Sequence, residues 1–585
     1  MRAAAFLVPA ALCVLWTLGA GKDVNWDLLN YHYYAPWQLL EGRLAQDFFA
    51  ASAQSYLNPV GYLPFYLMVS SGWHSVLASS LLAALHALSL TFLYFIARRL
   101  FAHLPPREQT LFACLSTALG AATWVFWPTV GSSFLDPLLA PLILGGLLFL
   151  IDGKHTLLAG VLFGAAAALK YSNGIYVLAA LPLVLTLRAT LAYVAGAGLA
   201  IAVLAGPWML ALLREFGNPV FPLMNAWFES PHALPVNLVS ERFTPRGFLE
   251  ALAIPFRMAA LDRHLYSEIF APDLRLALLM LAGVALPFTR PHLTAADRRM
   301  LAFFALAAVL WIASSANARY GLPVLLLAGL ALARLAEHLL PRHGARIALA
   351  TLLVVQVAIS LVAAPTRWFL AELWTARWLP YDAPERAPAL YLSVEVQPMA
   401  VVAPFLHPES AFVNFSGLHS LPADAPRLVA LLERYRGRVR VLGRATEPTA
   451  YNTALRRLAL RVDPGDCFTI EWRAEREPSS EPLSVVSCAL VAAARDPADL
   501  EAERRMSALF ERIEKRCAAL LSGQTAVTEP FGASGWSRNY PGLDARLEAF
   551  GGSVLLHRYR SAEVLELGRL ADWARDDVPL PPACR

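Results

Sequence analysis

Three aspartates beside long apolar segments, Asp23, Asp27 and Asp136, form the outward-facing set of candidate residues. A carboxylate within or beside a membrane span is costly to bury and usually faces a water-filled cavity, so each is a candidate site residue. An ionised carboxylate can accept a proton from a hydroxyl group, which is general-base chemistry. The structural alternatives are that Asp23 or Asp27 stabilises a helix N-terminus, and that Asp136 caps the helix that Pro137 begins.

Two basic side chains complement these carboxylates. Lys170 in "AALKYSNG" and Arg319 in "SSANARYGLP" each stand where an apolar helix gives way to a turn of small polar residues. A buried phosphate requires cationic partners, so we expect both to bind the phosphate or pyrophosphate of a lipid. The alternative for each is that the long side chain snorkels to the membrane interface. Arg242 and Arg246 are weaker candidates.

His32 lies among aromatic residues, where it can support the site as a base or metal ligand, or serve as a hydrogen-bonded structural residue. The sequence contains no HExxH or GxSxG pattern and no Walker or Rossmann fingerprint. These absences argue against a hydrolase or a nucleotide-binding domain, and the residues alone predict no metal site.

The stretch from residue 21 to 64 must position Asp23, Asp27 and His32. Five apolar residues recur in it at helical spacing, beside a polar stripe; they are Trp26, Leu29, Tyr33, Trp37 and Leu40, and the stripe is Asp27, Asn30, Tyr34, Gln38 and Glu41. This pattern predicts a helix in a membrane interface, with aromatics toward lipid and carboxylates toward a cavity. Pro36 is expected to kink or break it.

The composition is that of an integral membrane protein. Of 585 residues 57% are hydrophobic and only 16% are charged, against about 25% in soluble domains. The net charge of +5 comes from scattered basic residues, which excludes a nucleic-acid partner and indicates membrane topology instead. Windows of about 20 apolar residues predict eleven spans; they are 3–20, 74–97, 109–128, 136–151, 155–170, 174–187, 191–212, 273–289, 299–316, 321–340 and 346–364.

With a cytoplasmic N-terminus, basic residues fall in every inward loop, including Arg98, Arg99 and Lys154. Residues 1–364 then form the membrane domain, with outward loops at 21–73 and 213–272 that we expect to pack together. An odd number of spans places residues 365–585 outside, in the periplasm of a bacterial inner-membrane protein. The first span can alternatively be a cleaved signal peptide.

Residues 365–585 have the composition of a globular domain. The strands "AFVNFSG" and "VRVLGR" flank the helix "DAPRLVALLERYRG", which is an α/β pattern, and a second long helix is expected over 497–521. The four cysteines of this region can form two disulfides in an oxidising compartment, with three connectivities open; they are Cys467, Cys488, Cys517 and Cys584.

This combination resembles the GT-C superfamily of integral-membrane glycosyltransferases, with bacterial glycosyltransferase 87 and mannosyltransferase-like groups as the nearest likeness. The resemblance covers residues 1–365, and the motifs that carry it are "DVNWDLLNYHYY", "SSFLDP", "AALKYSNG", "FGNPVFP" and "ARYGLP". It implies a polytopic α-helical fold of about eleven spans followed by a periplasmic α/β domain. It also implies a polyprenyl-phosphate-linked sugar donor and a glycan, lipid or protein acceptor.

In that family an acidic residue of the first outward loop is the general base. The resemblance gives this role to Asp27, with Asp23 as the competitor. Many members carry two adjacent acidic residues there, whereas Asp23 and Asp27 are four apart, so both the choice of base and the use of a divalent cation stay open. A single base without a covalent intermediate implies inversion at the anomeric carbon. The alternatives to a transferase are a transporter or flippase of lipid-linked glycans and a non-catalytic envelope scaffold.

Overall fold

The computed structural model describes residues 2–238, 242–260, 266–289, 293–417, 419–474, 483–494, 497–521, 526–531, 535–540, 543, 545–558, 563–573, 575 and 580–584. Contacts group the chain into two compact units. Unit 1 comprises Met1–Asn25, Val60–Pro207 and Phe243–Trp378, and unit 2 comprises Trp26–Pro59, Trp208–Arg242 and Leu379–Arg585. The predicted boundary at residue 365 stays a prediction.

Unit 1 is built from helices. Those that are central to the site are α7 (Leu135–Ile151), α8 (Thr156–Leu169), α15 (Ala295–Ser314) and α16 (Leu322–Leu339). The others are α1 (Arg2–Ala20), α3 (Leu63–Ser70), α4 (Ser75–His86), α5 (Leu88–Leu100), α6 (Pro106–Ala121), α9 (Gly174–Ala180), α10 (Leu187–Leu204), α13 (Phe248–Ala259), α14 (Arg275–Thr289) and α17 (Arg342–Ala363).

In the described part of the chain, five helical stretches are long and apolar enough to cross a membrane, and the predicted count of eleven is not confirmed. They are Ala3–Ala20, Ser75–Leu100, Leu187–Leu204, Leu322–Leu339 and Arg342–Val362. The window 174–187 contains only the seven-residue helix α9, which spans about 10 Å and is too short to cross a bilayer. Pro182 lies in the 3₁₀ turn that follows α9, where the α-helical hydrogen bonds end.

Helices α8 and α10 approach closely because glycines line their contact. A Cβ at Gly160 would lie 2.1 Å from the carbonyl oxygen of Tyr193, and one at Gly196 would lie 2.2 Å from that of Leu157. The "GAGLA" segment at 196–200 therefore belongs to a close helix-packing surface, where small residues let two backbones approach. This packing fixes α8, whose last residue is followed by Lys170.

A short ladder joins the first loop of unit 1 to the segment after α17. Strand β1 (Lys22–Val24) pairs antiparallel with β2 (Leu370–Glu372). Arg367 reinforces the ladder by donating to the carbonyl oxygens of Gly21, at 3.0 Å, and Val130, at 2.6 Å. Lys22 is fully buried and forms a 3.1 Å ion pair with Glu372. The ladder thus holds the chain around Asp23 against the end of unit 1.

Unit 2 contains a six-stranded sheet of order β3-β7-β8-β6-β4-β5. The predicted strand, helix and strand correspond to β5 (Ala411–Asn414), α18 (Pro426–Arg434) and β6 (Val439–Gly443). Both strands pair in parallel with β4 (Leu390–Ser393), which lies between them. The remaining strands, β3 (Tyr381–Asp382), β7 (Leu460–Trp472) and β8 (Val485–Ala492), join antiparallel.

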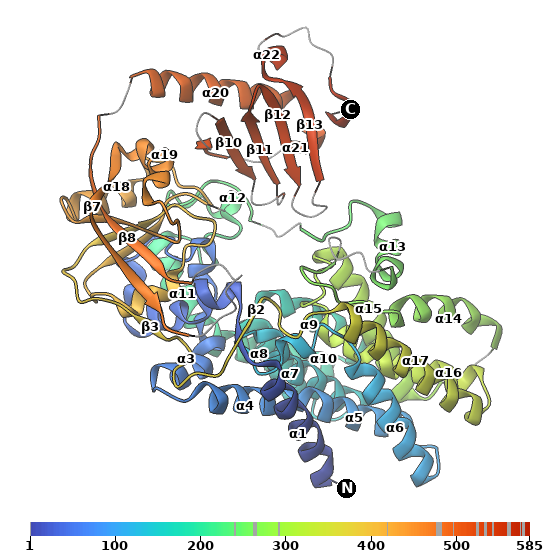
Figure 1. Ribbon diagram of the computed structural model, residues 1–585. Coiled ribbons are helices and arrows are strands. Elements are labelled where there is room, and N and C mark those ends of the chain that lie inside the picture. Colours follow the sequence, from blue (N-terminus) through green and yellow to red (C-terminus); the bar gives the residue numbers. More distant parts are fainter. Residues whose placement is uncertain are drawn as a thin grey trace. The chain divides into compact units, whose positions relative to one another are not determined.

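A second sheet, not predicted from the sequence, follows this one. It is an antiparallel meander of β9 (Thr528–Phe531), β10 (Gly535–Tyr540), β11 (Ala545–Phe550), β12 (Ser553–Arg558) and β13 (Glu563–Arg569). Helix α20 (Pro497–Arg516) packs on it through Phe510 and Ile513 (Figure 1). The four cysteines of the region form two disulfides, Cys467–Cys488 between β7 and β8 and Cys517–Cys584 beside α20.

The loops 21–73 and 213–272 contribute to the core of unit 2. Tyr56 contacts the rings of Phe216 and Phe221, and its carbonyl oxygen accepts a 2.9 Å hydrogen bond from Trp208 in α11 (Gly206–Phe216). These aromatics share one buried cluster with β4 and β5. The two loops pack together as expected, but within a protein core.

The predicted interfacial helix differs from expectation. The chain forms a π-helical turn η1 (Leu28–His32) and then α2 (Tyr34–Leu40), with Pro36 accommodated in the first turn of α2. Leu29, Tyr33 and Trp37 of the aromatic stripe are at most 8% exposed. Tyr33 stacks on Phe405, so the middle of this stripe faces protein rather than lipid, whereas Leu40 at its end is 53% exposed. An apolar stripe on a helix indicates burial, but the sequence alone does not tell whether protein or lipid covers the stripe.

Candidate functional site

The segment from Gly131 to Asp136, at the start of α7, is the centre of the candidate site in unit 1. Gly131 has a φ of 70°, and a Cβ there would lie 2.5 Å from the side chain of Thr17. Glycine therefore permits the turn and its close approach to α1. Phe134 is the N-cap residue of α7, and Asp136 makes no capping hydrogen bond. The capping interpretation of Asp136 is wrong, because its carboxylate is engaged elsewhere.

Asp136 pairs with Lys170. The Lys170 Nζ lies 2.5 Å from Oδ1 of Asp136, in an environment where the lysine side chain is 18% exposed and the aspartate 4%. The Lys170 ammonium also lies 4.4 Å from the centre of the Tyr320 ring. The second oxygen of Asp136, Oδ2, is buried without a hydrogen-bond partner among the described residues. A buried acceptor left unpaired costs about 1–3 kcal/mol, so this carboxylate has capacity for a further donor.

Arg319 lies in the turn between α15 and α16, between two aromatic rings. Its guanidinium carbon is 4.7 Å from the centre of the Phe134 ring and 5.2 Å from that of Trp368. One Nη is 3.5 Å from Oε1 of Glu268, an oxygen to which the Asn317 amide also donates at 3.2 Å. The two rings fix the plane of the guanidinium, and its 3.5 Å ion pair with Glu268 is longer than a close charge-assisted hydrogen bond.

The two cations share one site. Phe134 and Asp136 are two residues apart and contact Arg319 and Lys170 respectively. On the opposite side Tyr320, which follows Arg319, lies under Lys170. Two short turns therefore bring a guanidinium and an ammonium to the same place, an arrangement suited to an anion with several oxygens, such as a phosphate.

Asp23 joins this site through Asn25. The Asn25 amide donates to Oδ2 of Asp23 at 2.5 Å and to the hydroxyl of Ser133 at 3.1 Å. Asp23 is fully buried, and its backbone carbonyl accepts a 3.1 Å hydrogen bond from Trp378. Burial lowers the pKa of Arg367, and the charge of Asp23 opposes that shift. Asp23 is thus a carboxylate enclosed by neighbours, bound to the segment that carries Asp136.

Asp27 and His32 belong to unit 2. Asp27 immediately precedes η1, makes no side-chain cap, and is half-buried. His32 is 1% exposed, with its ring 4.6 Å from that of Tyr31. No group of three or more His, Cys, Asp or Glu side chains suited to a metal ion occurs among the described residues. The structure thus brings together Asp23, Asp136, Lys170 and Arg319 within unit 1, whereas Asp27 and His32 belong to unit 2.

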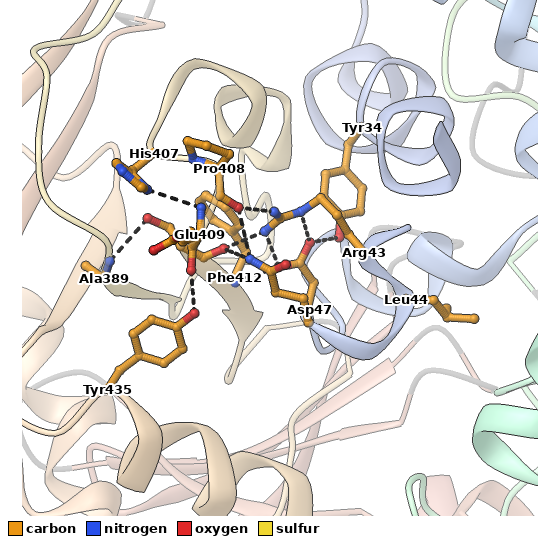
Figure 2. Close-up of polar contacts among 12 residues, drawn as sticks. Tyr34, Arg43, Leu44, Asp47, Ala389, His407, Pro408, Glu409, Phe412 and Tyr435 are labelled. Carbon is orange, nitrogen blue, oxygen red and sulfur yellow. Dashed lines mark hydrogen bonds and ion pairs between the residues drawn. The ribbon is translucent and has the colours of Figure 1, made fainter. Parts of the chain in front are cut away.

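A polar cluster in unit 2 was not predicted from the sequence (Figure 2). Arg43 donates to both oxygens of Asp47 at 2.9 Å, and Asp47 also accepts from the Tyr34 hydroxyl at 2.9 Å and the Phe412 amide at 3.0 Å. Arg43 also donates to the carbonyl oxygen of Pro408. Burial raises the pKa of Asp47, and Arg43 opposes that shift. The i,i+4 spacing was the available signal, but it is equally typical of an exposed helix pair.

No protein-family model matches this chain, and no curated protein matches it. Among solved structures, the crystal structure of ArnT from Cupriavidus metallidurans bound to undecaprenyl phosphate is similar to it, with a TM-score of 0.43 and 14% sequence identity. The likeness covers 83% of this chain and 97% of that one. A likeness of this size assigns no activity, and the residues of the site carry the functional argument.

Proposed function

We propose that this chain is a membrane glycosyltransferase that transfers a sugar from a polyprenyl-phosphate-linked donor to a cell-envelope acceptor. The observation that carries the proposal is the convergence of Lys170 and Arg319 on the segment from Phe134 to Asp136. In this proposal the donor lies in a bacterial inner membrane, and the site opens to the periplasm and to the bilayer. The finer assignment to a glycosyltransferase 87 or mannosyltransferase-like group belongs to the same proposal.

The two cations fit the leaving group of this reaction. As the bond between the anomeric carbon and the phosphate oxygen breaks, negative charge grows on the phosphate, and donors already in place stabilise it. Arg319 offers a planar fork held between two rings, and Lys170 offers a point charge. Asp136 orients Lys170, and the second carboxylate oxygen of Asp136 can accept a hydrogen bond from a hydroxyl group of the sugar. Lys170 and Arg319 thus bind the phosphate, and Asp136 and His32 support the site.

We assign the general base to Asp27 rather than Asp23. The base must take the proton of the acceptor hydroxyl while that oxygen bonds to the anomeric carbon, so it must be reachable by the acceptor. Asp23 is fully buried in a strand and accepts a hydrogen bond from the Asn25 amide, whereas Asp27 is half-buried. The covalent chain keeps the Cα atoms of Asp27 and Asn25 within about 7 Å. One base without a covalent intermediate predicts inversion.

The test uses full-length protein reconstituted in lipid vesicles with undecaprenyl-phosphate-linked hexoses and pentoses and an envelope extract as the acceptor source. Asp27→Asn should abolish transfer with an unchanged melting temperature, and product from the wild type should be inverted. Glu41→Gln removes an exposed carboxylate from the same loop and should be neutral. If Asp27→Asn retained near-normal transfer and a folded Asp23→Asn protein lost it, Asp23 would be the general base. Absence of transfer from every donor would discard the proposed activity.

A further inference from the structure

A groove of about 570 Å³ lies in unit 1 at the opposite end of α7 from Asp136. It is lined by the end of α7, the start of α8, residues 182–186 with Ala189, and the first turns of α15. The 17 residues of α7 separate it from Asp136 by about 25 Å. This end of α7 faces the cytoplasm in the predicted topology, so the groove is remote from the proposed transferase site.

Most of the groove wall is apolar, and two arginines stand at its rim. Pro182, Leu183 and Val184 supply part of the apolar wall, and Arg298 and Arg299 supply the charge. Arg299 donates to the carbonyl oxygen of Ile151 at 2.9 Å. Gly153 permits this approach, since a Cβ there would lie 2.9 Å from the guanidinium. Arg299 is thus fixed at the end of α7.

Two carboxylates near these arginines pair with other residues: Asp297 precedes Arg298 in the chain, and Asp152 follows Ile151, to which Arg299 donates. Asp297 receives two hydrogen bonds from Arg334, at 2.7 and 2.8 Å, and caps α15 together with Thr294. Asp152 pairs with Arg99 at 2.9 Å. The charges of Arg298 and Arg299 are therefore not neutralised by these neighbours, and the rim favours an anion.

Apolar surface continues beyond the rim. Leu185 is 83% exposed and Leu187 is 75% exposed, on the segment that enters α10. A soluble anion would gain nothing from these side chains, whereas an amphipathic ligand would bury them with its acyl chains. Basic pockets between transmembrane helices on the cytoplasmic side suit anionic lipid headgroups. The charged rim and apolar wall together match a phosphate joined to acyl chains.

We propose that this groove binds the phosphate headgroup of an anionic glycerophospholipid, with Arg298 and Arg299 contacting the phosphate and residues 182–186 contacting an acyl chain. The site does not depend on the proposed glycosyl transfer. Because α15 leads into the turn that carries Arg319, the lipid would brace the helix that ends at the opposite site.

The experiment titrates purified full-length protein in an uncharged detergent with dioleoylphosphatidylglycerol or dioleoylphosphatidylcholine, and measures bound lipid by native mass spectrometry. We expect preferential retention of phosphatidylglycerol, with affinity falling about fivefold for each arginine removed in Arg298→Gln and Arg299→Gln. Ala302→Trp fills the groove from an exposed position of α15 without a change of charge, and it should also lower retention.

Arg188→Gln is the matched control, because it removes an exposed arginine near the groove that does not line it. It should leave retention unchanged. Equal retention of the two lipids, an equal loss in Arg188→Gln, or full retention in Ala302→Trp would overturn the proposal. If inorganic phosphate alone raised the melting temperature as much as phosphatidylglycerol, the ligand would be a free anion and the lipid assignment would be wrong. If the arginine variants fail to fold, lipid retention by the Ala302→Trp variant tests the proposal instead.

Discussion

Two buried ion pairs, one in each unit, differ in how completely their atoms are used. In unit 2 both oxygens of Asp47 accept hydrogen bonds from Arg43, and Tyr34 and Phe412 fill the remaining positions (Figure 2). In unit 1 Asp136 uses one oxygen for Lys170. Both carboxylates are nearly inaccessible to solvent, so burial does not distinguish them.

The difference indicates which pair is structural. A pair whose donors and acceptors are all satisfied by protein has no capacity for a ligand, and its loss is felt as instability. A pair with an open oxygen, a partly exposed lysine and a neighbouring Arg319 retains capacity for a substrate. We therefore expect changes in the Arg43–Asp47 pair to affect folding and changes in the Asp136–Lys170 pair to affect transfer.

The largest expected effect is that of Arg43→Leu. It would leave the buried Asp47 unpaired and should lower the free energy of unfolding by about 3–5 kcal/mol. Thermal unfolding of the purified protein measures it. Arg436→Leu breaks an exposed i,i+3 pair with Glu433 in the same unit and should change stability by less than about 0.5 kcal/mol. Equal melting temperatures for the two variants would show that the closed pair is not structural.

Arg319→Gln should have the next largest effect, this time on activity. Loss of a preorganised donor to the departing phosphate is expected to lower transfer by about 10²–10³-fold, with an unchanged melting temperature. Arg246→Gln, an exposed residue of the second outward loop, is the control. A fall in stability without a fall in transfer per folded molecule would place Arg319 among the structural arginines.

Asp136→Asn tests whether Asp136 and Lys170 act as a unit in transfer. We expect transfer to fall about tenfold, because Lys170 loses its orienting partner but keeps its charge. Lys170→Met should cost more, and the double variant should cost no more than Lys170→Met alone, since the two act as a unit. Additive losses in steady-state assays would show that Asp136 acts separately from Lys170.

The smallest expected effect concerns pH and a second closed contact of unit 2. His419 lies 2.7 Å from the Ser52 hydroxyl through Nδ1, and burial lowers its pKa to about 4. The imidazole of His419 therefore binds a proton more readily in the unfolded chain than in the folded protein. The free energy of unfolding should fall as the pH drops from about 6.5 to about 4. The expected decrease is about 1 kcal/mol, because the side chain is partly exposed to solvent. His419→Asn should reduce this pH dependence of the melting temperature. The exposed His343→Asn variant should retain it, and an unchanged profile in His419→Asn would contradict the assignment.

Local signals in the sequence indicated several elements and residues. Strand, helix and strand over 411–444 follow from apolar alternation and helix boundaries, and the turns around Lys170 and Arg319 follow from small polar residues after apolar helices. The pairing of Asp136 with Lys170 and the ring sandwich around Arg319 depend on contacts between distant turns, which periodicity does not encode. The burial of Tyr33 and Trp37 was missed for the same reason, since the surface that covers them comes from residues near 405 and 412.

The β1 and β2 ladder has a consequence for the order in which the protein is made. Arg367 and its acceptor Gly21 are 346 residues apart, and Lys22 and Thr375 are 353 apart. The first loop therefore cannot reach its final hydrogen bonds until the ribosome has passed the last long helix of unit 1. Contacts of such long sequence separation form late and slowly. The contacts that hold the chain around Asp23 in place therefore form late in the assembly of unit 1.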